Sequence, residues 1–467
     1  MKWTLSILSV VAAVSAQSST PLPPSQDPFY AAPDNLDSYN PGDIIRSRNT
    51  PSPLFGYTGV EKAIQILYRT NDAQNNSQAT VTTVIVPTNA NFSQLLSYQD
   101  YEDSAYSACA PSYAFQLVNG SDSLVQPLLD SGWVVNVPDY EGPLSAYCSG
   151  YQAGHATLDA IRACLQSNNI TGINENATVI MAGYSGGALA SGWAAQLQPS
   201  YAPDLKIAGA AFGGFPVNIS ATALAVNEAS NAGLVPAGML GMGAAYPVVN
   251  QTLFANLFPN NSSYFLRAGH ECLDQDELDF AYQNIFSYFM NGEGLLTAPG
   301  VLEVLQLNTM GAHPPQIPIY LWQAIEDEVA PVGDVDKTIT EYCNDGAPSI
   351  EYVKYPVLDH EETGDAGFPA AYLWINNIFS GSAPISGCST TTTTAPANSS
   401  STSAASNSTT TASSVSATSA IQPTVSSSTS NTTVSTAPSS GPASASAAST
   451  SHVSLVLLFV AALCIVF

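Results

Sequence analysis

Positive charge is scarce in this chain of 467 residues. It contains 10 Lys and Arg residues against 36 Asp and Glu residues, so its formal net charge at pH 7 is −26. Such an excess of negative charge repels phosphate groups, which argues against nucleic acid and anionic lipid headgroups as partners. The composition instead suits an acidic extracellular setting.

Residue patterns that bind metal ions are also missing. The sequence has no C-x-x-C, no H-E-x-x-H and no acidic calcium-binding loop. These spacings are the ones that bring ligands together around zinc or calcium. We therefore expect no metal site and no other cofactor.

The N-terminus has the three parts of a secretory signal peptide. Met1 and Lys2 form a charged start, residues 3–14 are apolar, and Val14-Ser15-Ala16 are small. This pattern predicts that residues 1–16 are removed on secretion, with a buried N-terminal helix as the alternative. Secretion also fits the N-glycosylation sequons of the chain before its Ser/Thr-rich segment, which begin at Asn75, Asn91, Asn119, Asn169, Asn176, Asn218, Asn250, Asn260 and Asn261.

The other end of the chain has the composition of a stalk followed by an anchor signal. Residues 389–451 are almost all Ser, Thr, Ala, Pro and Asn, with no charged residue. Such a segment cannot bury a core, so we predict an extended, O-glycosylated stalk. Residues 452–467 form an apolar tail without a following basic residue, which is typical of a GPI attachment signal. We expect a link to the plasma membrane or cell wall, with a transmembrane helix as the alternative.

Residues 17–388 remain for a folded domain. Strand-like apolar runs alternate there with helical patterns, which predicts an α/β fold with a mostly parallel sheet flanked by helices. In such folds the functional residues lie at the carboxyl ends of the strands. The predicted strands cover residues 80–87, 133–138, 177–182, 207–212, 317–322 and 350–355, and the predicted helices cover 151–167 and 188–195.

One segment breaks this alternation. Between residues 207 and 266 the only charged residue is Glu228, and residues 221–258 are rich in Ala, Leu, Val, Met, Gly and Phe. We interpret about residues 215–312 as an insertion between two strands. It is either a set of ordinary core helices or a mobile cap that lines an acyl-binding cavity and meets lipid.

A serine between glycines follows the predicted strand 177–182. The sequence Gly183-Tyr184-Ser185-Gly186-Gly187 leads directly into the Ala-rich helix 188–195. Strand, tight turn and helix in this order form the nucleophile elbow of α/β-hydrolases, whose turn is too sharp for bulky neighbours. The pattern predicts an α/β-hydrolase fold with Ser185 as its nucleophile.

A serine nucleophile needs a histidine base and a carboxylate, and in this fold they follow in the order Ser, acid, His. His155 precedes the serine, and His452 lies in the tail. His270 and His313 both precede the late strand that should carry the acid. His360, in the loop after the last predicted strand, is therefore the predicted base.

The acid should follow the strand 317–322. Three consecutive carboxylates stand there, and Asp327 is the central candidate, with Glu326 and Glu328 as its alternatives. Asp334 and Asp336 are weaker candidates. Because side chains around a turn point in different directions, the spacing does not decide among them.

Six short motifs occur along the chain in a fixed order: Asp27-Pro28-Phe29-Tyr30, Pro41-Gly42-Asp43-Ile44-Ile45, Ser97-Tyr98-Gln99-Asp100-Tyr101-Glu102-Asp103, Gly183-Tyr184-Ser185-Gly186-Gly187, Ala324-Ile325-Glu326-Asp327-Glu328 and Asp359-His360. Through them the chain resembles the fungal secretory lipases, the group that includes the yeast lipase A type. The resemblance implies an α/β-hydrolase with a helical cap and a triad of Ser185, Asp327 and His360. It also implies an oxyanion hole formed by the backbone N–H of Gly186 and by Asp103.

Seven cysteines in a secreted chain imply disulfides. Six of them lie outside the apolar tail, and six cysteines allow fifteen pairings, among which spacing alone selects none. The resemblance implies the pairs Cys109–Cys272 and Cys343–Cys388, and it leaves Cys148 and Cys164 undecided.

The expected function is hydrolysis of triacylglycerol and other carboxylic esters by a secreted or surface-bound monomer at a lipid–water interface. A general carboxylesterase or acyltransferase with the same site residues is the second interpretation. A wall mannoprotein whose domain is structural or adhesive is the third, and the intact Ser185, Asp327 and His360 argue against it.

Overall fold

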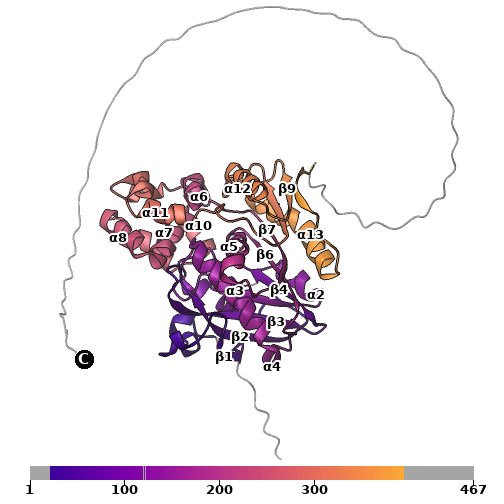
Figure 1. Cartoon of the computed structure of the whole chain (residues 1–467). Helices are drawn as coiled ribbons and strands as arrows, with labels where there is room; N and C mark the ends of the chain where they lie inside the picture. Colours follow the sequence, from indigo (N-terminus) through magenta and orange to yellow (C-terminus); the bar gives the residue numbers. More distant parts are fainter. Residues whose placement is uncertain (1–20, 119, 121, 394–467) are drawn as a thin grey trace, which may run out of the picture. The chain divides into compact units, whose positions relative to one another are not determined.

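The structure is a computed structural model that describes residues 21–118, 120 and 122–393 (Figure 1). The predicted signal peptide 1–16, the stalk from residue 394 onward and the apolar tail 452–467 lie outside the described residues. Within the described ranges, no helix combines the length and the apolar character that crossing a membrane requires.

A ten-stranded sheet forms the centre of the fold, in the order β1-β2-β3-β5-β4-β6-β7-β8-β9-β10. The pairs β1–β2, β2–β3 and β3–β5 are antiparallel, and every pair from β5 onward in this order is parallel. The predicted fold class, a mostly parallel sheet flanked by helices, is confirmed. The strands are β1 (Ile44–Asn49), β2 (Val60–Asn71), β3 (Ser77–Pro87), β4 (Asn91–Gln99), β5 (Trp133–Pro138), β6 (Thr178–Tyr184), β7 (Ile207–Gly213), β8 (Ile319–Ala324), β9 (Ser349–Tyr355) and β10 (Gly387–Thr392).

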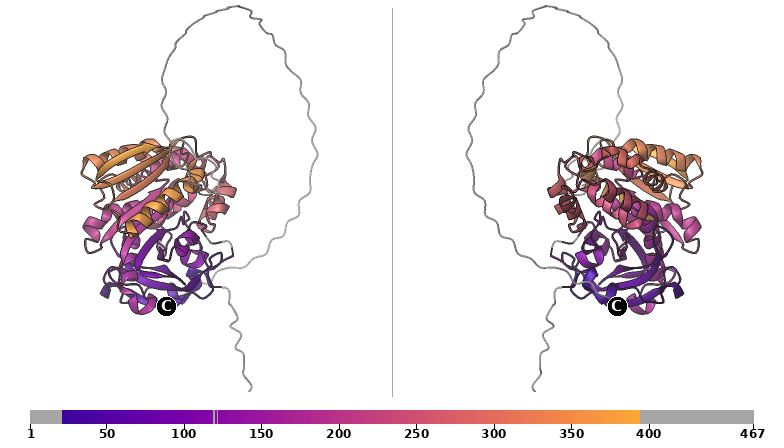
Figure 2. Two further views of the ribbon diagram at one scale, coloured as in Figure 1. Left: turned by 90° about the vertical axis from the view of Figure 1, so that its right-hand side faces the viewer. Right: turned by 90° about the vertical axis from the view of Figure 1, so that its left-hand side faces the viewer.

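Helices cover both faces of the sheet (Figure 2). The helices α3, α5 and α12 pack on one face, whereas α2 and α13 pack on the other. These helices and two short ones are α1 (Pro111–Ala114), α2 (Val125–Asp130), α3 (Gly150–Gln166), α4 (Asn168–Thr171), α5 (Gly186–Tyr201), α12 (Val332–Asn344) and α13 (His360–Phe379).

Strand β6 illustrates why the central strands are apolar throughout. Val179 and Met181 belong to the core cluster beneath α3 and α5, and Ile180 and Ala182 belong to the cluster beneath α13. Successive side chains of a strand point to opposite faces, and here both faces are covered by helices. The sheet therefore holds the elbow that follows β6 between two packed layers.

The sequence patterns do not predict β1, β2, β4 or β10. In β2 and β4 the apolar periodicity is hidden by buried polar side chains, including Gln65, Thr70, Ser97 and Gln99. At the other edge, β10 continues to Thr392, beyond the domain end expected at Cys388, and pairs with β9 in parallel. Its threonines have the composition of the stalk, but β-branched residues also favour an edge strand.

The helices between β7 and β8 form the cap, a name we keep for residues 215–312. In Figure 1 they gather on one side of the sheet. Phenylalanines of the cap are buried in it, among them Phe265, Phe280, Phe286 and Phe289. The α-helices of the cap are α6 (Ile219–Val226), α7 (Leu234–Ala245), α8 (Pro247–Asn256), α9 (Ser262–Phe265), α10 (Leu273–Phe280) and α11 (Val301–Leu307).

The two ends of the cap meet where it joins the sheet. Asn218 and Thr309 form an antiparallel bridge, and the N–H of Met310 donates to the Val217 carbonyl oxygen at 2.9 Å. We call residues 214–218 and 309–311 the neck of the cap.

Candidate active site

Ser185 lies on a strained turn between β6 and α5. Its φ of 54° and ψ of −117° are unfavourable for a residue with a side chain. Its N–H donates to the carbonyl oxygen of Gly213 at 3.0 Å, which fixes the turn against β7. The helix α5 begins at the next residue, so the strand, turn and helix expected around the serine are all present.

The glycines two residues before and after Ser185 have a steric cause. A Cβ atom on Gly183 would lie 2.5 Å from the carbonyl carbon of Gly187, and one on Gly187 would lie 2.0 Å from the carbonyl oxygen of Gln99. Backbone atoms cannot yield at such distances. The elbow can therefore form only if both positions lack a side chain.

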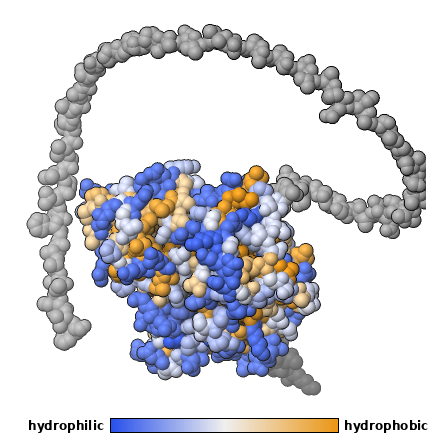
Figure 3. Space-filling model, turned by 45° about the horizontal axis from the view of Figure 1, so that its top comes forward, coloured by the Kyte–Doolittle hydropathy of each residue, from blue (hydrophilic) through white to orange (hydrophobic). Residues whose placement is uncertain are grey.

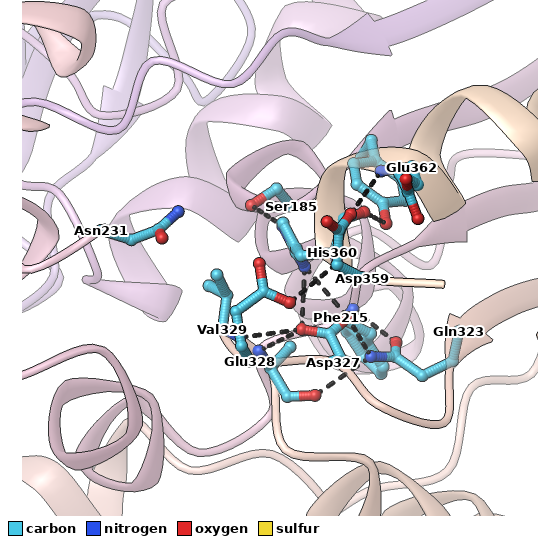
Figure 4. Close-up of polar contacts among 12 residues, drawn as sticks. Ser185, Phe215, Asn231, Gln323, Asp327, Glu328, Val329, Asp359, His360 and Glu362 are labelled. Carbon is cyan, nitrogen blue, oxygen red and sulfur yellow. Dashed lines mark hydrogen bonds and ion pairs between the residues drawn. The ribbon is translucent and has the colours of Figure 1, made fainter. Parts of the chain in front are cut away.

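His360 reaches Ser185 from the start of α13. Its Nε2 lies 2.9 Å from the Ser185 Oγ (Figure 4). The sequence places His360 in a loop, but it is the first residue of the helix, which Asp359 caps by accepting a hydrogen bond from the Glu362 N–H at 2.8 Å. A helix start gives the imidazole a more rigid support than a loop would.

Asp327 holds the other ring nitrogen of His360. The Nδ1 atom lies 3.0 Å from both carboxylate oxygens of Asp327. The Oδ1 atom also accepts the N–H groups of Val329 and Ala330, at 3.0 and 2.6 Å. The carboxylate is thus fixed by its own turn and faces the imidazole.

The alternative acids make other contacts. Glu326 and Glu328 are exposed, and Glu328 accepts the backbone N–H of His360 at 2.9 Å and not the ring. Asp334 accepts a hydrogen bond from the Asn218 side chain, and Asp336 pairs with Lys354. Of the five candidate acids, all within the described residues, Asp327 is the one that hydrogen-bonds the His360 ring.

The environment of His360 favours its protonated form. Burial alone would lower the pKa of His360, but the hydrogen bond and the negative charge of Asp327 outweigh burial, and the pKa lies above its usual value. A raised pKa means that the ring accepts a proton more readily, which suits a base that takes the proton of a serine hydroxyl.

Asp103, predicted to help hold an oxyanion, is buried beside the elbow. It has a positive φ of 41° and is 3% exposed. Burial raises the pKa of Asp103 to about 7, although the charge of His360 and the N–H of Gly186 act in the opposite direction. Gly186 adjoins this carboxyl group so closely that an added Cβ atom would lie 1.8 Å from its Oδ1. A side chain with this pKa is neutral in mild acid, and a neutral carboxyl group can donate a hydrogen bond.

Ser185, His360 and Asp103 line a pocket with about 1130 Å³ of space between atoms, part of it open to solvent. Its lining is acidic, and no Lys or Arg is among the described residues that form it. The carboxyl groups that share the pocket with Asp103 belong to Asp122, Asp274, Glu277, Glu361 and Asp365. No group of three or more side chains in the described part of the chain is arranged to hold a metal ion.

A second cavity, with about 650 Å³ of space between atoms, is lined by the cap together with Tyr147 and Cys148. Its lining is almost wholly apolar, with Val235, Met239, Met242 and Leu253 as examples. Leu234, at the start of α7, lines both this cavity and the pocket at Ser185. The two spaces therefore adjoin at this side chain.

Both expected disulfides are present, Cys109–Cys272 and Cys343–Cys388. The first joins the segment after Asp103 to the residue that precedes α10 of the cap, and the second joins α12 to β10. Cys148 and Cys164, left undecided by the sequence, are free thiols.

Two residues close to the site are absent from the sequence-based predictions. Gly214 has a φ of +58°, and an added Cβ atom would lie 2.7 Å from the Cε1 atom of His360. Gln323 is fully buried in β8 and donates to Asp327 at 2.7 Å. The only signal for Gln323 in the sequence is its amide side chain inside an otherwise apolar strand. The only signal for Gly214 is that two consecutive glycines follow a predicted strand.

Comparisons with known proteins agree with this architecture. The family model described as secretory lipase matches residues 113–387. Lipase A of Arthroderma benhamiae is 39% identical over 80% of this chain and 83% of its own length. Lipase 4 of Candida albicans is 38% identical over 83% of this chain and 88% of its own length.

Solved structures are similar to this chain as well. The X-ray structure of Candida antarctica lipase A in its closed state has a TM-score of 0.72 and 31% identity, covering 79% of this chain and 89% of that one. A rice cell wall degrading esterase from Xanthomonas oryzae has a TM-score of 0.60 and 17% identity, covering 72% of this chain and 97% of that one, which concerns the fold alone. With the family model matching more than half of its residues, the chain belongs to the secretory lipase family.

Proposed function

We propose that this protein is a serine lipase in which Ser185 attacks the ester, His360 moves the proton and Asp327 orients the imidazole. Its membership of the secretory lipase family makes it an ester hydrolase. The observation that carries the residue roles is the unbroken line of contacts from Ser185 Oγ to His360 Nε2 at 2.9 Å and from His360 Nδ1 to Asp327 at 3.0 Å. This is the geometry that activates a serine hydroxyl.

The reaction follows from these positions. His360 takes the proton of Ser185 as its Oγ attacks the ester carbonyl, and the imidazolium then protonates the leaving alcohol. Donors at Asp103 and at the Gly186 N–H would stabilise the oxyanion that develops. Water then attacks the acyl-enzyme, with His360 again as the base, and releases the fatty acid.

Triacylglycerol is the substrate class that the cavities favour. The apolar cavity of the cap adjoins the pocket at Ser185 and has the lining an acyl chain requires. Ten of the eighteen exposed large hydrophobic side chains in the described residues belong to the cap, among them Phe254, Phe258 and Leu278. On the face seen in Figure 3, hydrophobic residues lie scattered among hydrophilic ones. Exposed apolar side chains on the cap suit contact with a lipid–water interface.

We place the enzyme outside the cell. Its family is described as secretory, and the N-terminal pattern of residues 1–16 is that of a signal peptide. The stalk and apolar tail further suggest a GPI anchor. Release of the protein from cells by phosphatidylinositol-specific phospholipase would support the anchor, and its retention in the membrane after that treatment would contradict it.

The residue roles are tested by Ser185→Ala. We expect a loss of ester hydrolysis on the order of a million-fold, and loss of covalent labelling by a fluorophosphonate probe. Ser123→Ala is the matched control, because Ser123 lines the same pocket without contacting His360 in the described structure. Near-native hydrolysis by Ser185→Ala would refute the assignment.

The substrate class needs a separate measurement. A chain-length series of p-nitrophenyl esters, assayed beside an emulsified triglyceride, distinguishes a lipase from a general esterase. We expect hydrolysis of the emulsion and of long-chain esters. Activity confined to short, soluble esters would favour the carboxylesterase interpretation.

A further inference from the structure

Gln323 is a buried amide between the sheet and the loop of the acid. It is the fifth residue of the six-residue strand β8, Ile319–Ala324, and is 0% exposed. A buried amide costs free energy unless its polar atoms are paired. Its contacts therefore indicate what keeps it in this apolar strand.

The two ends of the amide have partners that fix its orientation. Its Nε2 donates to the Asp327 Oδ2 at 2.7 Å and to the carbonyl oxygen of Ala330 at 3.1 Å. Its Oε1 accepts the backbone N–H of Phe215 at 2.8 Å. A carbonyl oxygen can only accept and a backbone N–H can only donate, so both partners require the same placement of nitrogen and oxygen. In Figure 4 the amide end of Gln323 points toward Phe215 and Asp327.

The carboxylate of Asp327 depends on this amide for one of its two oxygens. The N–H groups of Val329 and Ala330 hold Oδ1. Among the described residues, the Oδ2 atom of Asp327 accepts hydrogen bonds from the His360 ring and the Gln323 side chain. Without it, the carboxylate could turn about its anchored oxygen and the imidazole would lose a fixed partner.

Phe215 connects the same amide to the cap. It is the first residue of the cap and lies in the neck, directly after Gly214. At the other end of the neck, the Gly311 N–H donates to the Oε1 of Gln196, a second buried glutamine, at 3.1 Å. Each end of the cap is thus tied to the α/β core by one glutamine oxygen, and only Gln323 also contacts Asp327 in the described structure.

We propose that Gln323 is a positioning residue that holds the Asp327 carboxylate in line with His360 and ties it to the neck of the cap. This inference rests on the proposed function, because it assigns Asp327 the task of orienting His360. Gln323 does not touch the substrate. It acts through Asp327, and its loss should lower kcat more than it changes KM.

Gln323→Glu is the substitution that separates positioning from simple packing. When protonated, the introduced carboxyl group can donate its single O–H to Asp327 and still accepts the Phe215 N–H, while the bond to the Ala330 carbonyl oxygen is lost at every pH. When ionised, it keeps the second contact, loses the first and places a negative charge against the Asp327 carboxylate. The other charged groups nearby are His360, bonded to Asp327, and Lys354, which stands opposite Gln323 in β9 but pairs with Asp336.

The measurement is kcat for a soluble p-nitrophenyl ester between pH 5 and 9, expressed as the ratio of the Gln323→Glu variant to the wild type. The ratio removes the titration that both proteins share. We expect it to be close to constant in acid and then to fall about tenfold per pH unit as the introduced group ionises. A ratio that is the same at every pH would overturn the proposal.

Gln323→Met provides a second variant that cannot titrate. It keeps the length and volume of the side chain but donates nothing to Asp327, so kcat should fall between about tenfold and a hundredfold at every pH. A Gln323→Met variant with wild-type kcat would also overturn the proposal. If Gln323→Glu does not fold, the kcat of Gln323→Met alone tests the proposal.

Gln196→Glu is the matched control. Gln196 is buried at the other end of the neck, and its oxygen accepts both the Gly311 N–H and the Tyr342 hydroxyl. A carboxylate can accept both bonds, so its kcat ratio to the wild type should not vary with pH. A pH-dependent fall in this control equal to that of Gln323→Glu would show that any buried charge at the neck suffices, and would overturn the assignment to Asp327.

Failure of this inference is distinct from failure of the proposed function. If the wild type neither hydrolyses esters nor labels with a fluorophosphonate, the proposed function fails. If the wild type does both and the Gln323 variants behave as wild type, only the role of Gln323 fails.

Discussion

Gly214 leaves room for the imidazole of His360. An added Cβ atom would lie 2.7 Å from both the Cε1 of His360 and the Cζ of Tyr184. We predict that Gly214→Ala displaces the imidazole from Ser185 and lowers kcat on the order of a hundredfold, because small misplacements of a reacting group are costly. Steady-state kinetics with a p-nitrophenyl ester measures this.

Gly346→Ala is the control for Gly214→Ala. Gly346 also has a positive φ, 93°, but no atom lies within 4 Å of its Cβ position. The backbone penalty of about 1–2 kcal/mol is then present without the contact to His360. Equal kcat values for the two variants would contradict a steric role of Gly214.

Asp103 combines a proposed donor role with an unusual pKa. Burial raises its pKa to about 7, so the side chain is neutral near pH 5 and ionised near pH 8. Asp103→Leu removes the donor and should lower kcat on the order of a hundredfold, whereas Asp103→Asn keeps N–H donors that do not ionise and should lose less. The kcat of Asp103→Asn relative to wild type should rise from pH 5 to pH 8. Equal losses in both variants at every pH would exclude a donor role.

The order of motifs along the chain is enough to predict Ser185 and His360, because the topology of the fold fixes the order in which site residues follow. It is not enough to choose among Glu326, Asp327 and Glu328, since consecutive side chains in a turn diverge. Gln323 is beyond such reasoning. The role of a single amide in an apolar strand becomes evident only from its hydrogen bonds with Phe215 and Asp327.

Prediction of the secondary structure elements from the sequence has a similar limit. Strands that are apolar throughout, such as β6, are predictable because both their faces are buried. β2 and β4 carry buried polar residues whose partners come from distant segments, for example the Gln99 oxygen that accepts the Ser191 hydroxyl at 2.7 Å. The residue pattern of a single strand does not show which distant side chain will hydrogen-bond a buried polar residue in it.

Of the two disulfides, Cys109–Cys272 joins elements next to the candidate active site, and Cys343–Cys388 does not. Cys109–Cys272 ties the segment after Asp103 to the cap, and the Ser104 hydroxyl donates to the Glu271 carbonyl oxygen at 2.8 Å beside it. We predict that replacing this pair by serines lowers kcat/KM per folded molecule, because the Asp103 segment loses its support. Replacing Cys343 and Cys388 should leave kcat/KM unchanged.

Stability alone does not distinguish these two double variants. The sequence separations of 163 and 45 residues correspond to losses of about 5 and about 4 kcal/mol in the chain-entropy model. Thermal melts therefore serve to choose a temperature at which both are folded, and activity is compared there. Equal kcat/KM in the two variants would contradict a role of the first disulfide in site geometry.

Most of the carboxyl groups that are buried in the described residues form no ion pair with Lys or Arg. Burial raises the pKa of Asp139 to about 7 and that of Asp276 to about 8, and it raises the pKa values of Asp100, Glu102 and Glu141 well above normal. Such groups ionise in the unfolded chain at lower pH than in the folded one. The folded state then binds more protons, and the free energy of unfolding falls as pH rises.

We predict that Tm falls between pH 5 and pH 8.5, the range in which Asp139 and Asp276 ionise in the folded state. His155 acts in the opposite direction, since burial lowers its pKa to about 4 and destabilises the fold in acid. It is one group against several carboxyls, so the carboxyls should decide the sign. Melts are measured in about 0.5 M NaCl, where repulsion between surface charges is screened but buried groups are not.

Asp276→Asn tests whether buried carboxyls cause the trend. Asp276 is 0% exposed, and burial is the main reason that its pKa reaches about 8. At pH 5 both side chains are neutral, so the variant and the wild type should melt at similar temperatures. At pH 8.5 the wild type carries a buried charge that the variant lacks, and the variant should melt at the higher temperature. A difference in Tm that does not grow with pH would contradict a role of the buried Asp276 charge in the pH dependence of stability.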